Sequence, residues 1–266
     1  MEYQKLKSSN LNRIWNRIGE EAQDIISTQN KMSSFIYSCV LNHKNIQSVI
    51  SYRLAQKLST IDMSESTINQ VALDCFVEDE KLIDCVYSDL IAVLDRDPAC
   101  NRYLQPILYF KGFLALQAYR VSNYLFAKNN QDLAYFLQMR SSEVFSVDIH
   151  PGAKLGKGIM IDHAHAIVIG ETAVVGDDVS MLHSVTLGGT GKEKGDRHPK
   201  IGDGVLIGAG ASILGNIKVG RCSRIASGSV VLTDVPDCKT VAGVPAKIVG
   251  EAGCGQPSTL MNHNLD

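Results

Sequence analysis

The second half of this chain has no aromatic residues. The sequence of 266 residues contains 1 Trp, 9 Tyr and 7 Phe, and all of them lie at or before Phe145. Glycine has the opposite bias, because only Gly19 and Gly112 of the 22 glycines precede residue 146. A chain of this length suffices for one or two domains. The change in composition predicts two, spanning residues 1–145 and 146–250, followed by a flexible tail of residues 251–266.

The chain also lacks a strong net charge and a long apolar run. Its 26 Lys and Arg residues nearly balance 28 Asp and Glu residues, giving a formal charge of −2, so no strong field attracts nucleic acid or an anionic membrane. No apolar run approaches the ~20 residues that a membrane-spanning helix needs. The first ten residues are polar and do not resemble a secretory signal. We therefore expect a cytoplasmic protein that has neither nucleic acid nor a membrane as its partner.

Paired cysteine motifs are absent as well. The chain has seven cysteines, and none of them lies in a Cys-x-x-Cys motif. This argues against a disulfide scaffold or a zinc ribbon and favours a reduced, cytoplasmic chain. Cys222 and Cys238 are unusual for their positions in the repeats described below, and the sequence shows no partner for either.

The first half has the pattern of helices. Apolar residues recur at steps of three and four, which predicts helices over residues 11–26, 33–41, 46–58 and 81–94. The Asp97-Pro98 dipeptide predicts the end of a helix and a turn. Residues 108–137 then read as one or two long helices. We expect an all-α domain that packs against itself or a partner.

The second half repeats every six residues. Ile149 and every sixth residue after it up to Val185 is apolar, and the pattern restarts at Ile201 and runs to Val231. Five of the first seven positions that follow these residues by three are glycine. This period fits neither an α-helix nor a simple amphipathic strand. It is typical of a parallel β-helix, with one inward aliphatic residue per strand and glycine where the chain bends.

Such a coil would contain three faces of six residues, or 18 residues, and about 100 residues would form roughly five coils, above the minimum of about three. The absence of aromatic rings fits a narrow interior. The fold class is therefore α+β, an all-α domain followed by a parallel β-helix. The periodicity does not determine the hand of the β-helix.

Two segments in the repeats carry candidate chemistry. His163 can be an ordinary surface residue, but Asp148 lies 15 residues earlier, close to one coil, where a carboxylate could fix the tautomer of the ring. Residues 186–200 interrupt the repeat. They are either a solvated loop or a functional one, and they include Arg197 and His198. An arginine can hold a carboxylate with two hydrogen bonds.

Glycines in the interrupting loop do not form a phosphate-binding loop of the P-loop type. Glu193 follows Gly191-Lys192, where that motif requires Ser or Thr. The glycines still allow a ligand to approach the backbone closely. No cysteine falls among the motifs, so a cysteine nucleophile is not expected.

Taken together, the motifs resemble the serine O-acetyltransferase family of the hexapeptide-repeat acyltransferases. The resemblance covers roughly residues 11–250. It rests on Asp-Ile-His-Pro at 148–151, Asp-His-Ala at 162–164, Gly-Glu-Thr-Ala-Val at 170–174, Ser-Val-Thr-Leu-Gly-Gly-Thr-Gly at 184–191, Gly-Asp-Arg-His-Pro-Lys at 195–200, Arg-Asp-Pro-Ala at 96–99, Tyr-Phe-Lys-Gly-Phe at 109–113 and Ala-Gly-Val-Pro-Ala at 242–246. It implies a left-handed parallel β-helix of hexapeptide repeats and acetyl transfer from acetyl-CoA to L-serine, with no metal required.

The resemblance also implies roles for individual residues. His163 would be the general base and Asp148 would orient it. Serine would be bound by the remaining matched residues of the amino-acid site, which are Asp97, Asp162, Arg197 and His198. Acetyl-CoA would lie in a groove between adjacent β-helices, at Gly189, Ala209, Ser227 and Lys247. Several have a simpler interpretation, with Asp97 as a helix terminator, Asp162 as a corner residue and Lys247 as a surface lysine.

Further expectations concern assembly and regulation. The family forms trimers that pair through their helical domains into hexamers, and L-cysteine, the product of its pathway, inhibits it. In the family the tail often ends in isoleucine and inserts into O-acetylserine sulfhydrylase. This chain ends Leu265-Asp266, which suits an apolar pocket poorly and argues against that complex. A second departure is His165, which is either another titrating group near the site or a solvent-facing residue.

Two other functions fit part of the sequence. A γ-type carbonic anhydrase would hold zinc with three histidines, chosen from His150, His163, His165, His183 and His198. It leaves the helical half and the Asp148 and Arg197 segments unexplained. A scaffold that uses the repeat only to form trimers leaves the interrupting loop without a reason.

Overall fold

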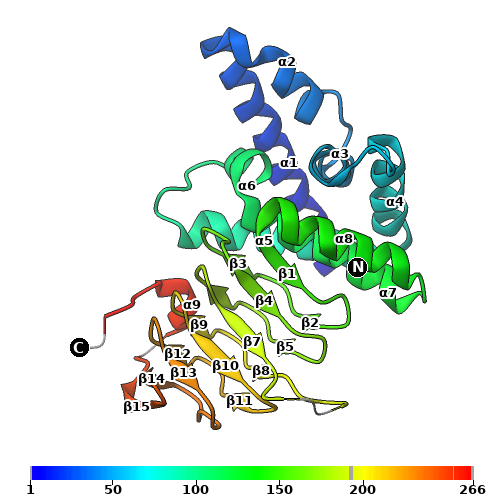
Figure 1. Ribbon diagram of the computed structural model, residues 1–266. Coiled ribbons are helices and arrows are strands. Elements are labelled where there is room, and N and C mark those ends of the chain that lie inside the picture. The colour runs from blue at the N-terminus through cyan, green and yellow to red at the C-terminus, as the bar shows by residue number, and fades with distance from the viewer. Residues whose placement is uncertain (1, 192–193, 254, 265–266) are drawn as a thin grey trace.

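The chain folds as a group of helices followed by a three-sided β-helix (Figure 1). The computed structural model describes residues 2–191, 194–253 and 255–264, with side chains from Leu11 onward. Lys192, Glu193, Leu265 and Asp266, which were used in the arguments above, lie outside the described residues. The helices are α1 (Glu2–Thr28), α2 (Ser33–Ile36), α3 (Ile46–Leu58), α4 (Glu65–Glu78), α5 (Glu80–Arg96), α6 (Leu104–Tyr109), α7 (Lys111–Ala127) and α8 (Gln131–Phe145), with a 3₁₀ turn at Asn30–Met32 and a π-helical turn at Tyr37–Leu41.

Most of the predicted helices are present, and α4 was missed. The one or two long helices expected over residues 108–137 are α7 and the first part of α8. α7 is separated from α6 at Phe110, which adopts an extended conformation, and from α8 near Asn129, which has a φ of 61°. Side-chain caps define several of the starts. The side chains of Asn45, Ser64 and Asp79 accept hydrogen bonds from the first-turn N–H groups of α3, α4 and α5. No helix in the described part of the chain is both long and apolar enough to cross a membrane.

The change from helix to strand falls at Ser146, where the composition changes. Three sheets then form the faces of the β-helix, in the orders β1-β4-β7-β10-β13, β11-β8-β5-β2 and β15-β14-β12-β9-β6-β3. All neighbours are parallel except β14 and β15. The strands are β1 (Val147–Ile149), β2 (Lys154–Leu155), β3 (Met160–Ile161), β4 (Ile167–Ile169), β5 (Val174–Val175), β6 (Ser180–Met181), β7 (Thr186–Gly188), β8 (Lys200–Ile201), β9 (Leu206–Ile207), β10 (Ser212–Leu214), β11 (Lys218–Val219), β12 (Arg224–Ile225), β13 (Val230–Val231), β14 (Lys239–Gly243) and β15 (Ala246–Glu251).

Each predicted inward residue is buried except Leu155, which is half-buried. The predicted stacking is nevertheless wrong for the first coil. Ile149 pairs with Ile169 and not with Ile167, because the corner between β3 and β4 is two residues longer than the corner between β6 and β7. Aliphatic residues occupy two inward positions per strand here, so the sequence pattern stayed apolar and concealed the shift.

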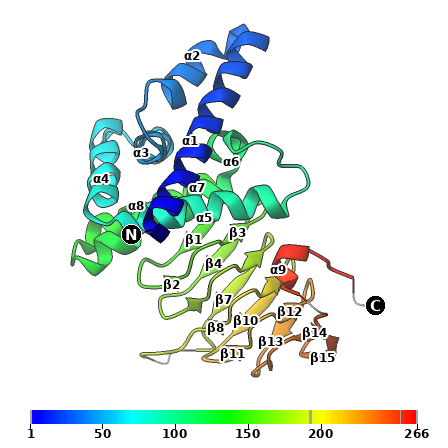
Figure 2. The ribbon, with the colours of Figure 1, turned by 180° about the vertical axis from the view of Figure 1, so that it is seen from behind.

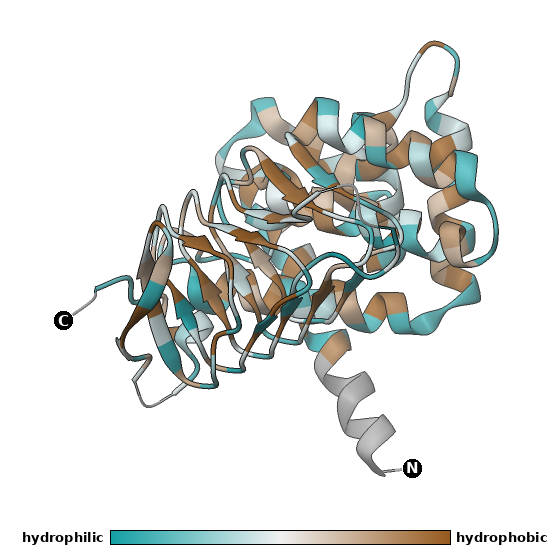
Figure 3. Ribbon diagram, turned by 60° about the horizontal axis from the view of Figure 1, so that its bottom comes forward, coloured by the Kyte–Doolittle hydropathy of each residue, from teal (hydrophilic) through white to brown (hydrophobic). Residues whose placement is uncertain are grey.

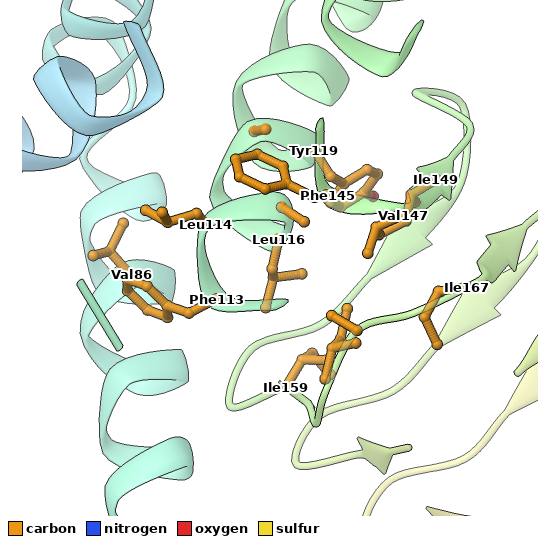
Figure 4. Packing of buried hydrophobic residues seen from close by; sticks show 14 of the residues in the cluster. Val86, Phe113, Leu114, Leu116, Tyr119, Phe145, Val147, Ile149, Ile159 and Ile167 are labelled. Atoms are coloured by element: carbon orange, nitrogen blue, oxygen red, sulfur yellow. The ribbon is translucent and has the colours of Figure 1, made fainter. Parts of the chain in front are cut away.

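Hydrophobic strands line the coils in Figure 3, while the corners between them are mostly hydrophilic or neutral. The helices continue this core at its first coil. Figure 4 shows buried side chains of α5, α7 and α8 in one cluster with those at the start of the β-helix. The labelled helical residues are Val86, Phe113, Leu114, Leu116, Tyr119 and Phe145, and those of the β-helix are Val147, Ile149, Ile159 and Ile167. The helical part and the β-helix therefore share one continuous core.

Two buried arginines connect the helices to the β-helix through hydrogen bonds. Arg120 of α7 donates two hydrogen bonds of 2.8 Å to the fully buried Asp89 of α5 and a third to the carbonyl of Gly156. Asp89 also accepts the backbone N–H of Ile159 at 3.0 Å. Arg96 donates to the carbonyl of Gly158, to Ser180 and to Asp178. The corner after β2 is thus held at several points by α5 and α7.

The C-terminal segment, which we expected to be flexible, packs against the β-helix in this structure. Its short helix α9 (Pro257–Leu260) lies beside α5, β6 and β9 (Figure 2). Ser180 Oγ donates to the carbonyl of Ser258 at 2.9 Å, and Arg224 donates to that of Asn262 at 3.1 Å. Met261 packs against Val93, Cys100 and Met160.

The Asp89→Ala variant should be less stable than the parent by about 3–5 kcal/mol, because it leaves the Arg120 guanidinium buried without a counter-charge. Urea unfolding followed by circular dichroism measures this difference. Asp62→Ala removes a carboxylate from an exposed position and should change the stability by less than about 0.5 kcal/mol. Equal unfolding midpoints for the two variants would contradict a structural role for the buried pair.

Candidate active site

A cavity of about 650 Å³ lies where the helices meet the first coil. Its walls come from the end of α5 and the turn after it, the junction of α6 and α7, and the corner after β3. The lining residues are Val93, Asp97, Pro98, Ala99, Tyr109, Phe110, Lys111, Gly112, Phe113, Met160, Ile161, Asp162 and His163. Three predicted site residues, two carboxylates and one histidine, therefore meet in one cavity although they are up to 66 positions apart in the chain.

The corner after β3 presents the histidine. Asp162 is half-buried, and its Oδ2 lies 3.5 Å from Nε2 of His163, whose side chain is 70% exposed. The ring of His183 stands edge-on to the ring of His163, with centroids 5.8 Å apart, and its buried Nδ1 has no hydrogen-bond partner. Sequence reasoning considered His183 only as a zinc ligand. His183 belongs to the coil after that of His163, and only the edge-on contact of the two rings in the structure adds it to the site.

Backbone geometry explains why this corner projects into the cavity. The two extra residues are accommodated by positive φ angles at His163, Ala164 and Ala166, which is uncommon for residues other than glycine. The start of α7 packs directly onto it, because a Cβ atom at Gly112 would lie 2.1 Å from the carbonyl oxygen of Ile161. Only glycine permits this approach of helix and corner.

Asp97 ends α5, as its simpler interpretation predicted, and still lines the cavity. Its Oδ1 accepts the N–H of Ala99 at 2.8 Å, which fixes the turn through Pro98. The carboxylate is thus held at the cavity wall by the local turn and has further acceptor capacity for a ligand.

Lys111 is the one lysine or arginine among the lining residues, and sequence reasoning missed it. Its Nζ lies 2.8 Å from Nδ1 of His165, and burial lowers its pKa. His165 is exposed, as a solvent-facing residue would be, and its contact with Lys111 also places it near the cavity. The cavity therefore contains more negative than positive charge, which favours a cationic group such as an ammonium.

The structure does not bring Asp148 to His163. Asp148 lies in the middle of β1, paired with Val168, and its Oδ1 accepts a hydrogen bond of 2.7 Å from Gln138. This coil advances by 20 residues between paired positions, so a separation of 15 residues ends in the corner before β4. The predicted contact is absent from the described geometry, and Asp162 is the carboxylate beside His163.

Arg197 and His198 form a second cluster with residues from the preceding coil. Arg197 donates from Nη2 to Oε2 of Glu171 at 2.8 Å, and this bond lowers the pKa of the glutamate. The hydroxyl oxygen of Thr172 accepts the backbone N–H groups of Arg197 and His198 at 3.0 and 3.1 Å. Sequence reasoning used Glu171 and Thr172 only as part of a motif, and their place one coil below the loop is what makes them anchors.

The same threonine determines the tautomer of His198. The backbone N–H of Thr172 donates to Nδ1 of the ring at 3.1 Å, so a neutral ring carries its proton on Nε2. Burial, and then the charge of Arg197, lowers the pKa of His198, which favours this neutral form. Nε2 lies 2.1 Å from where a Cβ of Gly170 would be. His198 is thus positioned as a hydrogen-bond donor.

The two clusters lie at opposite ends of the strands in the sheet that begins with β1, and so at two different edges of the three-sided β-helix. Asp162 and His163 precede β4, whereas Glu171 follows β4 and Arg197 precedes β8. The predicted acetyl-CoA residues divide in the same way. Gly189 lies against Arg197, whereas Ala209 and Ser227 stack in successive corners on the edge of His163. Lys247 is exposed on β15 and pairs with Ala242, which lies beside the corner of Ser227.

Within the described ranges, no three or more His, Cys, Asp or Glu side chains are arranged to hold a metal ion. The histidines considered for zinc separate, with His150 and His198 near one edge and His163, His165 and His183 near the other.

Comparisons with known proteins find relatives for both the helical half and the repeat half of the chain. A family model described as "Serine acetyltransferase, N-terminal" matches residues 14–118, and one described as "Bacterial transferase hexapeptide (six repeats)" matches residues 198–233. Serine acetyltransferase of Salmonella typhimurium is 51% identical over 95% of this chain and 93% of its own, and serine acetyltransferase 4 of Arabidopsis thaliana is 47% identical over 97% of this chain and 72% of its own. A serine acetyltransferase structure from Vibrio cholerae superimposes with a TM-score of 0.94 at 47% identity, covering 96% of this chain and 98% of that one.

The chain belongs to the serine acetyltransferase family.

Membership confirms the parallel β-helix of hexapeptide repeats and the acyltransferase class inferred from the motifs. Solved relatives include a Neisseria gonorrhoeae serine acetyltransferase in complex with serine, at 50% identity with a TM-score of 0.86 over 88% of this chain and 96% of that one. A Brucella abortus serine acetyltransferase in complex with coenzyme A is 48% identical, with a TM-score of 0.90 over 93% and 99%.

For a member of this family, Gly170→Ala should lower the rate of acetyl transfer by about 10²-fold, because the new methyl group displaces the His198 ring and a shift of 1 Å can have that effect. The rate of coenzyme A release measures it. Gly250→Ala adds a methyl group where no atom lies within 4 Å and should leave the rate unchanged. A Gly170→Ala enzyme as active as the Gly250→Ala enzyme would remove His198 from the site.

Proposed function

We propose that this enzyme transfers the acetyl group of acetyl-CoA to the hydroxyl of L-serine, giving O-acetyl-L-serine and coenzyme A, the first step from serine to cysteine. The observation that carries the proposal is the cavity in which Asp97, Asp162 and His163 meet. Two carboxylates suit the serine ammonium, and a histidine beside them can accept the hydroxyl proton. Acetyl-CoA is the co-substrate and no metal is required.

His163 acts as the general base in this mechanism. It takes the proton of the serine hydroxyl as the oxygen attacks the thioester carbonyl, and later returns it to the leaving thiolate of coenzyme A. Such help is worth about 10²–10⁴-fold, and holding both substrates together supplies much of the rest. The neighbouring Asp162 carboxylate supports the imidazolium that forms.

The serine carboxylate needs a cation. Lys111 of the cavity wall is hydrogen-bonded to His165, and we assign the carboxylate to Arg197, with His198 as a second donor, from the neighbouring subunit of a trimer. The position of the two clusters at opposite edges of one sheet supports this assignment, because a cyclic trimer joins unlike edges of adjacent copies. Acetyl-CoA would lie in the groove so formed, between Gly189 of one subunit and Ala209 and Ser227 of the next, with Lys247 near its nucleotide phosphates.

Regulation and assembly follow from the same site. L-cysteine presents the same ammonium and carboxylate as serine, so it should bind to Asp97, Asp162 and Arg197 and compete with serine directly. We further propose a cytoplasmic enzyme whose trimers pair through the helical parts into a hexamer.

Coenzyme A release in the presence of a panel of hydroxyl amino acids tests the proposal. L-serine should be the preferred acceptor, and L-cysteine should raise the apparent KM for serine without lowering the maximal rate. Release that does not depend on any amino acid, or cysteine inhibition that serine cannot relieve, would contradict the assignment of the cavity.

The His163→Ala enzyme should lose about 10²-fold or more in kcat while keeping its oligomeric state. Asp148→Asn should be milder, since its carboxylate binds Gln138 and does not touch His163. Steady-state kinetics and size-exclusion chromatography measure both. A folded His163→Ala enzyme with the parent kcat would show that another group is the base.

A site formed by two neighbouring subunits leads to a further prediction. Arg197→Ala should raise the KM for serine more than the KM for acetyl-CoA. When His163→Ala and Arg197→Ala chains are assembled together, about a quarter of the interfaces combine the two intact residues, and activity should recover in proportion. Mixing the two separately assembled oligomers is the control. No recovery after joint assembly would mean that both residues serve a site within one subunit.

A further inference from the structure

Cys222 and Cys238 occupy equivalent corners of successive coils. At this corner, between the second and third faces, every coil places a residue in the left-handed region, with φ of 67° at Gly158, 56° at Asp178, 67° at Gly204, 52° at Cys222 and 57° at Cys238. Glycine, asparagine and aspartate are the residues that tolerate this conformation best. The last two coils have cysteine there instead, at a conformational cost.

Backbone hydrogen bonds place the two cysteines directly above one another. The N–H of Cys222 donates to the carbonyl of Asp203 at 2.8 Å, and one coil later the N–H of Cys238 donates to the carbonyl of Arg221 at 2.9 Å. The adjoining strands keep this register, since Arg224 pairs with Thr240. Neighbouring strands are about 4.8 Å apart, which lies within the Cα–Cα range of about 4.4–6.8 Å that a disulfide spans.

The preceding residues reinforce the alignment. Arg221 donates from Nε to Oδ2 of Asp237 at 3.1 Å, and its backbone N–H donates to Oδ1 of the same carboxylate at 3.0 Å. The two corners are therefore held in register immediately beside the thiols.

Accessibility separates Cys238 from the other described cysteines. Cys238 is exposed, Cys222 and the helical Cys85 are half-buried, and Cys39, Cys75 and Cys100 are buried. Burial, and then the neighbouring Cys238, raises the pKa of Cys222. Cys238 is thus the more accessible thiol of the two, and a reagent in solution reaches it first.

We propose that Cys222 and Cys238 are a redox-active dithiol, which a low-molecular-weight disulfide such as oxidised glutathione converts to an intramolecular disulfide joining the last two coils. The Cys238 thiolate attacks one sulfur of the reagent, whose S–S bond breaks and releases one thiol. The Cys222 thiolate then attacks the Cys238 sulfur and releases the second thiol. Both protein protons pass to the released thiols, so the pair loses two electrons and the reagent gains them.

The bond would close a loop that contains β12 and β13 and would restrain the coils that are farthest from the helices. A loop of this length loses much of its freedom in the unfolded chain when it is closed. The oxidised protein should therefore melt several degrees higher than the reduced protein, and dithiothreitol should reverse the shift.

Tryptic mapping tests the pairing, because the sequence places a cleavage site between the two cysteines. Cleavage after Arg221, Arg224 and Lys239 puts Cys222 in the peptide 222–224 and Cys238 in the peptide 225–239. The full chain is incubated with oxidised glutathione, its remaining thiols are alkylated, and the digest is analysed by mass spectrometry. We expect the two peptides to be linked in most of the protein, and the link to disappear after reduction.

Variants separate this pair from other thiols. The linked peptide and the rise in melting temperature should be lost in both Cys222→Ser and Cys238→Ser, and kept in Cys254→Ser, which removes the cysteine of the tail. Circular dichroism checks that each variant is folded. Oxidised protein that contains only glutathione on Cys238, or a Cys238–Cys254 link in place of the 222–238 link, would overturn the proposal.

Discussion

Stacking of aliphatic side chains inside a narrow β-helix is the constraint on which the rest of this structure depends. The interior admits residues such as Ile149, Ile169 and Val185 and excludes rings and charges, so every polar side chain of the second half lies outside or in a corner. The candidate functional side chains of the second half therefore lie in the corners. His163, Arg197 and the dithiol of Cys222 and Cys238 each lie where the chain turns from one face to the next.

A cavity forms where the helices pack against one of these corners. Asp89, Arg120 and Arg96 hold α5 and α7 against the first coils through buried hydrogen bonds, and Gly112 allows the start of α7 to touch the corner that carries His163. Buried ion pairs add little stability compared with apolar packing, but breaking them is costly. Their effect here is positional, since they bring Asp97 to the cavity in which Asp162 and His163 lie.

A parallel β-helix also separates residues that belong to one reaction. Each strand of the first sheet has one corner before it and another after it. The proposed base, His163, lies in a corner of the first kind, and the pair proposed to bind the serine carboxylate, Arg197 and His198, lies in a corner of the second kind. On this proposal one copy presents half of a site at each edge, which is the arrangement that a cyclic oligomer can complete at every interface. Trimerisation would then be a requirement for binding serine as well as a source of stability.

The sequence by itself determined the helical half and the six-residue repeat, because periodicity and composition are local properties. The resemblance to the family rested on its motifs, such as Asp-His-Ala at 162–164 and Gly-Asp-Arg-His-Pro-Lys at 195–200. It also identified Asp97, Asp162 and His163, whose motifs are continuous in the chain. It could not determine the contact of His163 with Asp162 in place of Asp148, because two extra residues in one corner shift the stacking while every inward position stays aliphatic. Lys111, Glu171 and the alignment of Cys222 with Cys238 likewise became visible only in the tertiary structure. Glu171 and the two cysteines depend on which residues lie one coil apart, and Lys111 depends on where the start of α7 meets the first coils.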